Sequence, residues 1–371
     1  MRILQVIPEL DAGGAERTTL EVAEAIIAAG GEALVVSEGG RLVEELDGLG
    51  AEFIRLPVKT KNPLSLMANA RALTNICRTR AVDIIHARSR APAWSALWAA
   101  RACRIPFVTT YHGAYGGRSA LKRLYNSVMA RGDRVIANSG FIAEHVAATH
   151  HVEAKRLRVI ARGVDLDRFD PDAMDASSIK ALRHGWGAMK SDRVILLPGR
   201  LTAWKGQTLA IEAVGALKRS DLVLVCAGDE QGRSQYRESL RQLAARLGVR
   251  LVLPGHVTDV PAAMAAADIV MAPSVEPEAF GRTAAEAMAM ARPVIAAAHG
   301  GALEVIDPGR TGWLVRPGDP AALGEALLDA LSADAEMLQD MGERSRLRVI
   351  ERFSKAALQA STLRVYRELL E

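Results

Sequence analysis

The sequence is poor in cysteine. Only Cys77, Cys103 and Cys226 occur among its 371 residues, and they lie far apart along the chain. Three scattered cysteines fit neither a disulfide framework nor a zinc site. We therefore expect a protein of a reducing compartment, the cytoplasm.

Long apolar runs and aromatic residues are also scarce. No apolar run reaches the roughly 20 residues that span a bilayer, and the start, MRILQVIPEL, turns polar too soon for a signal peptide. Aromatic residues make up 4% of the chain and no base-stacking motif occurs, so a nucleic-acid-binding protein is the weakest of the alternatives. The length and the 49% of hydrophobic residues indicate a globular protein of two domains.

Acidic residues are almost missing from one stretch. The segment from Lys59 to Arg134 contains 14 Lys and Arg residues but only two acidic residues, Asp83 and Asp133. Its net charge is +12, and the remainder of the chain carries −8. One interpretation is that these are ordinary solvated helix faces. The other is a surface for an anionic partner, such as acidic lipid, a phosphorylated acceptor or nucleic acid.

Short apolar runs alternate with amphipathic stretches along the chain. The predicted strands are RILQVI, EALVVS, VDIIHA, PFVTTY, RVIANS and LRVIA in the first half, and RVILLPG, DLVLVCAG, RLVLPG, DIVMAPS and RPVIAA in the second. In the first half, amphipathic stretches such as 16–29 and 119–131 are predicted helices, and in the second half the predicted helices are 206–218, 233–247, 260–266, 281–291, 319–350 and 354–370. This alternation predicts an α/β fold with two parallel sheets, joined by an Asp-rich linker at 162–177. Ligands of such sheets bind beyond the carboxyl ends of the strands.

Two loops that follow predicted strands suit a phosphate group. Gly13 and Gly14 would let the backbone approach a ligand, and the helix that begins near Ala15 would offer N–H groups to an anion, although a plain tight turn fits equally well. Arg200 and Lys205 follow RVILLPG and would clamp a diphosphate. The alternative for this pair is two exposed cations on a surface turn.

The segment SVEPEAFGRTAAEAMAM (274–290) holds two carboxylates, Glu278 and Glu286. Gly281 suits a first helical turn with accessible N–H groups. Glu286 lies in an almost wholly apolar helix, where a buried carboxylate needs hydrogen-bond donors, and sugar hydroxyls are such donors. Alternatively, Glu286 is solvated and Glu278 only favours the helix dipole.

The spacing Glu278-x7-Glu286 resembles the signature of the retaining GT-B glycosyltransferases of family 4, also called glycosyl transferases group 1. Further motifs agree in order and spacing: GGAE (13–16), HG (112–113), ANS (137–139), GVDLDRF (163–169), GRLTAWKG (199–206), AGD (227–229), RPV (292–294) and GRTGWLV (309–315). One residue departs from the pattern, because Arg162 stands where this family commonly carries Asn.

The resemblance implies a GT-B fold, with two Rossmann-like domains whose parallel sheets face each other across a cleft. Residues 1–168 would bind the sugar acceptor, and residues 169–351 would bind the nucleotide-sugar. A C-terminal helix at about 352–371 would cross back to the N-terminal domain.

The resemblance also implies roles for single residues. Glu278 would accept hydrogen bonds from the transferred sugar, Glu286 would hold the ribose, and Arg200 and Lys205 would neutralise the diphosphate. Substrate-binding residues at the helix start would be Phe280, Gly281, Arg282 and Thr283. In the N-terminal domain, His112 would face the sugar from the acceptor side, and Gly13, Gly14 and Asn138 would contact substrate.

The implied activity is transfer of a hexose to a glycan or glycolipid acceptor with retention of configuration and without a metal. UDP-glucose, UDP-N-acetylglucosamine, UDP-galactose and GDP-mannose are all compatible donors, and lipopolysaccharide or other envelope synthesis is the expected context. The DLD at 165–167 matches a metal motif of a different glycosyltransferase fold and is interpreted as linker. A nucleotide-sugar epimerase on a similar scaffold is the main alternative.

The basic segment, residues 59–134, indicates where the protein would meet its acceptor. Residues 118–134 are expected to form a basic amphipathic helix with an apolar stripe of Leu121, Leu124, Tyr125 and Val128. Trp94 and Trp98 mark one face of a neighbouring helix, and core packing is the favoured interpretation of that pair. The helix predicts peripheral contact with the anionic inner face of the cytoplasmic membrane, where a lipid-linked or phosphorylated glycan would be the acceptor.

Overall fold

The computed structural model describes residues 1–11, 13–115 and 119–371. They form two compact units: unit 1 is Met1–Gly163 with Lys355–Glu371, and unit 2 is Val164–Ser354. These boundaries differ by a few residues from 168/169 and 351/352 because Val164 pairs with Ser354 and donates its N–H to the carbonyl of Phe353. Among the described residues, no helix is both long enough and apolar enough to cross a bilayer.

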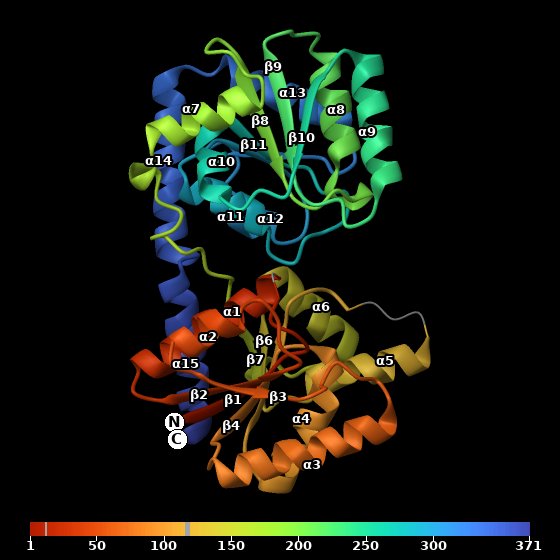
Figure 1. Cartoon of the computed structure of the whole chain (residues 1–371), viewed down its shortest axis with the longest axis vertical. Coiled ribbons are helices and arrows are strands. Elements are labelled where there is room, and N and C mark those ends of the chain that lie inside the picture. The colour runs from red at the N-terminus through yellow and green to blue at the C-terminus, as the bar shows by residue number, and fades with distance from the viewer. Residues whose placement is uncertain (12, 116–118) are drawn as a thin grey trace. The chain divides into compact units, whose positions relative to one another are not determined.

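Unit 1 is built on a parallel sheet with the strand order β3-β2-β1-β4-β5-β6-β7 (Figure 1). The strands are β1 (Arg2–Val6), β2 (Glu32–Ser37), β3 (Glu52–Arg55), β4 (Ile84–Ala87), β5 (Phe107–Tyr111), β6 (Arg134–Ala137) and β7 (Leu157–Val159). The helices are α1 (Gly14–Ala28), α2 (Val43–Gly48), α3 (Pro63–Thr79), α4 (Arg90–Cys103), α5 (Ala120–Asn126), α6 (Gly140–His150) and α15 (Lys355–Leu370), with short 3₁₀ turns η1 (Ser127–Arg131) and η2 (Ala154–Arg156).

Unit 2 repeats this plan with the strand order β10-β9-β8-β11-β12-β13. Its strands are β8 (Arg193–Pro198), β9 (Leu222–Ala227), β10 (Arg250–Gly255), β11 (Ile269–Ala272), β12 (Val294–Ala297) and β13 (Trp313–Val315). Its helices are α7 (Ala176–Gly185), α8 (Gln207–Ala216), α9 (Ser234–Leu247), α10 (Val260–Ala266), α11 (Arg282–Ala289), α12 (Ala302–Val305), α13 (Pro320–Ser332) and α14 (Ala335–Arg352), with 3₁₀ turns η3 (Pro171–Ala173) and η4 (Ala203–Lys205).

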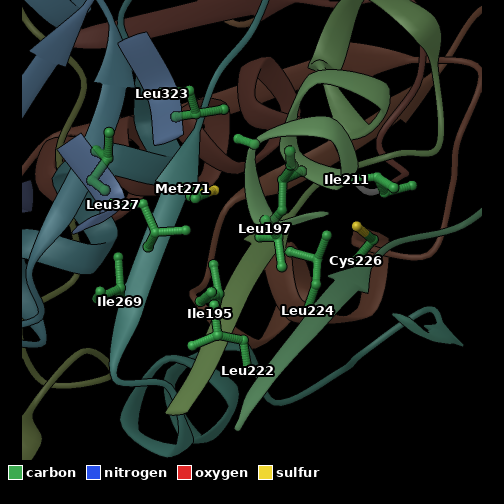
Figure 2. Close-up of a cluster of buried hydrophobic side chains, with 14 of the residues drawn as sticks. Ile195, Leu197, Ile211, Leu222, Leu224, Cys226, Ile269, Met271, Leu323 and Leu327 are labelled. Carbon is green, nitrogen blue, oxygen red and sulfur yellow. The ribbon is translucent and has the colours of Figure 1, made fainter. Parts of the chain in front are cut away.

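Alternation along the strands builds the core of unit 2. Side chains two residues apart on a strand share a face, so alternate residues of β8, β9 and β11 meet the helices α8 and α13 (Figure 2). This cluster includes Ile195, Leu197, Ile211, Leu222, Leu224, Cys226, Ile269, Met271, Leu323 and Leu327. The intervening Val194, Leu196, Val223 and Val225 are buried as well. Burial on both faces explains why the strands are continuous apolar runs in the sequence.

The last helix, α15, packs on unit 1, as the resemblance implied. The hydroxyl of Tyr366 lies 2.6 Å from Nδ1 of the buried His86 on β4, and Glu368 pairs with Arg134 and Arg158. The amide of Gln359 donates to the carbonyl of Glu21 on α1. These contacts fix the C-terminal segment to the sheet of unit 1.

Two predicted helices are divided in the structure. The stretch 119–131 forms α5 followed by the 3₁₀ turn η1, and 319–350 forms α13 and α14. The second break falls where Ala333 is extended and the carboxylate of Asp334 accepts the N–H of Met337, which caps a new helix. Strands β3 and β13 were not predicted, because EFIR is short and contains two charged residues, and WLV has only three residues.

Candidate functional site

The loops that follow β8 and β11 lie side by side, because these parallel strands are neighbours. The N–H of Val275 donates to the carbonyl of Trp204 across the two loops at 2.7 Å. Gly206 has a φ of +81°, and a Cβ atom there would lie 2.2 Å from the carbonyl oxygen of Pro273. Glycine is therefore required for the loops to approach this closely.

This approach brings Lys205 and Glu278 together. The Lys205 Nζ lies 2.7 Å from Glu278 Oε1, with the two side chains only 13% and 18% exposed. The hydroxyl of Ser274 donates to the same carboxylate oxygen, and the ammonium group stands 4.5 Å from the centre of the Trp204 ring. Because neither charge of this pair is well solvated, each charge depends on the other and on its hydrogen-bond partners for stabilisation.

Glu278 and Ser274 line a narrow pocket within unit 2. The other lining residues are mostly small: Ala272, Gly281, Ala284, Ala296, Ala297, His299 and Ala302. The Nε2 of His299 lies 2.8 Å from the carbonyl of Ser274, so this nitrogen carries the proton and donates. Sequence reasoning missed Ser274 and His299. Their only signal was position, because Ser274 ends one predicted strand and His299 lies just past another.

The second carboxylate, Glu286, lies on α11. The sequence predicts that it needs a donor, and Arg282 supplies one, with Nε 2.6 Å from Glu286 Oε1 one helical turn away. Gly281 precedes the helix with a φ of +85°, which an L side chain rarely adopts. The structure thus places Glu278 and Glu286 on either side of the start of α11.

Three further predicted residues belong to the loops and first helical turn of this part of unit 2. Arg200 is exposed just after β8, and its side chain forms no hydrogen bond or ion pair within the described part of the chain. Phe280 is buried with its ring against Phe353, so only its backbone is available to a ligand. Thr283 is partly buried in the first turn of α11.

The glycine pair of unit 1 begins α1. Gly13 is the N-cap and Gly14 the first helical residue, while Ala12 lies outside the described residues. A Cβ atom on Gly13 would overlap the carboxylate of Glu16 at 2.1 Å. A carboxylate of the chain itself therefore lies at this helix start, where the helix dipole favours negative charge.

His112 and Asn138 follow the neighbouring strands β5 and β6. His112 Nδ1 lies 3.3 Å from an Arg162 guanidinium nitrogen, and burial, then the charges of Arg162 and Arg88, hold the pKa of His112 well below its usual value. The imidazole is therefore neutral near pH 7. Asn138 is 2% exposed, and neither atom of its amide has a hydrogen-bond partner among the described residues.

The predicted basic helix is shorter, and its apolar stripe is divided. Val128 is fully buried in η1, and Arg118 lies outside the described residues. Trp98 is 40% exposed, which contradicts packing of the Trp pair in the core, although Trp94 is partly buried and donates to the carbonyl of Tyr125. The large exposed side chains of α5 are Leu121 (80%), Lys122, Arg123 and Leu124 (56%).

The Asp-rich linker contains a local turn. The carboxylate of Asp165 accepts the N–H groups of Asp167 and Arg168 at 3.2 and 3.3 Å. Over residues 1–11, 13–115 and 119–371, no three His, Cys, Asp or Glu side chains are grouped so that they could hold a metal ion.

Known proteins resemble the chain over its whole length. Residues 12–168 match the family described as Glycosyltransferase Family 4, and residues 178–348 match Glycosyl transferases group 1. A glycosyltransferase from Rickettsia africae ESF-5 is 34% identical, with a TM-score of 0.94 over 100% of this chain and 98% of that one. HepE from Anabaena, solved in complex with UDP-glucose, is 26% identical, with a TM-score of 0.86 over the full length of both chains.

Another match is partial. The D-inositol 3-phosphate glycosyltransferase of Salinispora arenicola is 34% identical over 232 residues, which are 59% of this chain and 50% of that protein. The chain thus spans about half the length of the curated relatives it matches. The two family matches, the Rickettsia structure and the paired parallel sheets agree: the chain belongs to the family 4, group 1 glycosyltransferases and has the GT-B fold.

Proposed function

We propose that this chain moves a hexose from a nucleoside diphosphate sugar to an acceptor hydroxyl, with retention of configuration. The observation that carries the proposal is the contact of Lys205 and Ser274 with Glu278 where two neighbouring strands end. A sugar diphosphate needs cations for its phosphates and acceptors for its hydroxyls, and this loop pair offers both. The complex of the related HepE with UDP-glucose supports a UDP-sugar as donor.

Different residues of unit 2 bind different parts of the nucleotide-sugar donor. Arg200, Lys205 and the N–H groups at the start of α11 stabilise the diphosphate, as fixed donors do for developing negative charge. Glu278 accepts hydroxyls of the hexose. Glu286, held by Arg282, accepts hydroxyls of the ribose.

The reaction exchanges one C–O bond for another. The bond between the anomeric carbon and the phosphate oxygen breaks, and the acceptor oxygen bonds to that carbon on the same face. The departing phosphate oxygen takes the proton of the acceptor hydroxyl, so the products are a glycoside and a nucleoside diphosphate. In this proposal the cationic side chains do the work of a divalent metal, and the neutral His112 positions the sugar rather than removing a proton.

The acceptor side of the proposal rests on unit 1. The segment 59–134 has a net charge of +12, and α5 within it exposes two leucines beside a lysine and an arginine. Such a surface suits the headgroup region of an anionic bilayer. We therefore propose a lipid-linked or phosphorylated glycan of the cell envelope as acceptor, and a peripheral position on the inner face of the cytoplasmic membrane.

Calorimetric titration with UDP, GDP, UDP-glucose and GDP-mannose tests the donor. We expect micromolar binding of one nucleotide-sugar, and a loss of about tenfold or more for the sugar, but not for the free nucleotide, in Glu278→Gln. NMR of the glycoside gives its anomeric configuration, and incubation of the donor alone detects epimerisation. An inverted product, or an epimer formed without acceptor, would contradict the proposal.

A further inference from the structure

Cationic side chains gather at the carboxyl edge of the unit 1 sheet. Arg90 lies just past β4, with its guanidinium 4.2 Å from the centre of the Tyr115 ring. Arg162 lies past β7 and contacts His112 at the end of β5. Arg88, directly after β4, is buried and its charge reaches His112 as well.

The partners of two of these arginines are neutral. Arg88 donates from Nε and Nη2 to the amide oxygen of Gln5, and Arg90 donates from Nη1 to that of Asn126. Within the part of the chain that the structure describes, neither arginine forms an ion pair with a carboxylate. The charge of Glu21 acts on Arg88 without a direct ion pair. A poorly solvated guanidinium that no carboxylate contacts is costly, so this edge of the sheet favours an anion.

A buried amide with unused hydrogen bonds lies at the same edge. Tyr111 on β5 is in register with Ala137 on β6, so the residues that follow, His112 and Asn138, are neighbours. The Asn138 amide is 2% exposed and without a partner among the described residues, and His112 Nε2 lacks one too. Because Nδ1 of His112 faces a guanidinium, Nδ1 is the acceptor and Nε2 carries the hydrogen. Buried polar groups are normally satisfied, so these atoms are positioned to hydrogen-bond a ligand.

The N-terminus of α4 adds positive potential at the same edge of the sheet. Arg90 is the first residue of this 14-residue helix, and the N-cap Ser89 forms no side-chain capping bond. N–H groups at a helix start attract anions, and here they accompany the guanidinium of Arg90.

We infer that the acceptor carries an anionic oxygen group, a phosphate ester or a carboxylate, close to the hydroxyl that receives the sugar, and that Arg90, Arg162 and Asn138 bind it. This inference rests on the proposed function, because it assigns the acceptor to unit 1. An arginine fork matches the two oxygens of either group, which a neutral polyol lacks. Asn, which this family commonly carries at position 162, would remove one of the two guanidinium groups, that of Arg162.

Matched acceptor probes test the inference. With the protein saturated with UDP, we would titrate myo-inositol 3-phosphate against myo-inositol, and glucuronic acid against glucose. At least one charged member should bind about tenfold or more tightly than its neutral partner, and the pair that discriminates identifies phosphate or carboxylate. Equal binding within both pairs, or no binding of any probe, overturns the inference.

Variants assign the binding to these residues. Arg90→Gln and Arg162→Asn should each reduce the discrimination about tenfold, while the Kd for UDP stays within about twofold of the wild type. Arg71→Gln, which removes one exposed charge from α3 of the same unit, should change neither quantity. Retained discrimination in both arginine variants would contradict the assignment. Failure of the wild type to bind any nucleotide-sugar would instead contradict the proposed function.

Discussion

Lys205 is the single residue on which the candidate donor site depends most. Removing its ammonium group leaves the Glu278 carboxylate in a position that is only 18% exposed, with Ser274 as its remaining side-chain partner among the described residues. We expect Lys205→Ala to lower the transfer rate about 10²–10³-fold, because a fixed cation at the developing diphosphate charge is lost. The free energy of unfolding should fall by about 1–3 kcal/mol, as for a buried group left unpaired. Initial rates and urea unfolding measure both quantities.

The exposed Lys180 on α7 provides the control for this substitution. Lys180→Ala should leave both the rate and the stability near those of the wild type. Near-normal transfer by Lys205→Ala would show that this lysine does not stabilise the diphosphate.

His112 makes the stability of the protein depend on pH. Burial and the charges of Arg162 and Arg88 lower its pKa well below 6.5, so the unfolded chain binds a proton that the folded chain does not. Stability therefore falls as the pH drops below about 6.5, by up to about 1.4 kcal/mol per pH unit for this one proton. Urea unfolding of wild type and His112→Gln between pH 5 and 7.5 should give a shallower slope for the variant. Identical slopes would mean that His112 titrates normally.

Single residues show what sequence could and could not predict. The apolar residues around Glu286 predicted that its carboxylate would need a hydrogen-bond donor. Arg282, four positions earlier in the sequence, could be identified by the same reasoning as that donor. The donor to Glu278 was not, because Lys205 is 73 residues away and only strand order makes them neighbours. Asn138 was recognised through its family motif alone, since the burial of its amide depends on tertiary packing.

Among elements, the junction of the η4 turn with the loop after β11 controls the geometry of the site. Gly206→Ala would place a methyl group against the carbonyl of Pro273 and force the two loops apart. We expect a loss of about 2–4 kcal/mol in stability, from strain at positive φ together with this overlap, and weaker donor binding. Chemical unfolding and UDP titration give the two values.

Gly232 is the matched control for that change. It has a φ of +77°, close to that of Gly206, but a Cβ atom there would meet nothing within 4 Å. Gly232→Ala should therefore cost only about 1–2 kcal/mol, the cost of the backbone conformation alone, and leave UDP binding unchanged. If the two variants lost equal stability, the close approach of the loops would have no energetic role.

The elements themselves were largely readable from the sequence, for a physical reason. Parallel strands covered on both faces must be apolar throughout, and such runs stand out between amphipathic stretches. Strands β3 and β13 escape this rule, because EFIR contains two charged residues and WLV has only three residues, too few to stand out as a run. The break between α13 and α14 depends on the Asp334 cap, which apolar periodicity does not reveal.

At the scale of the whole molecule, the division into two units was visible as a repeated pattern, whereas the return of α15 to unit 1 was implied by the family resemblance alone. Its anchor joins His86 to Tyr366 across 280 residues, and no local signal predicts such a pairing. The charge asymmetry was readable at once. The structure adds that the whole basic stretch from Lys59 to Arg134 belongs to unit 1.

This asymmetry predicts salt-sensitive binding to anionic membranes. We expect the protein to sediment with vesicles of phosphatidylglycerol and phosphatidylcholine at low salt, and to be released at about 0.3–0.5 M NaCl, where the Debye length falls to a few ångströms. The exposed leucines of α5 supply the apolar part of the contact, so Leu121→Asp with Leu124→Asp should weaken binding even at low salt. Leu328→Asp, at an exposed leucine of unit 2, is the control. If binding persisted at high salt, or if the α5 substitutions and the Leu328 substitution reduced it equally, the basic segment of unit 1 would not direct the protein to the bilayer.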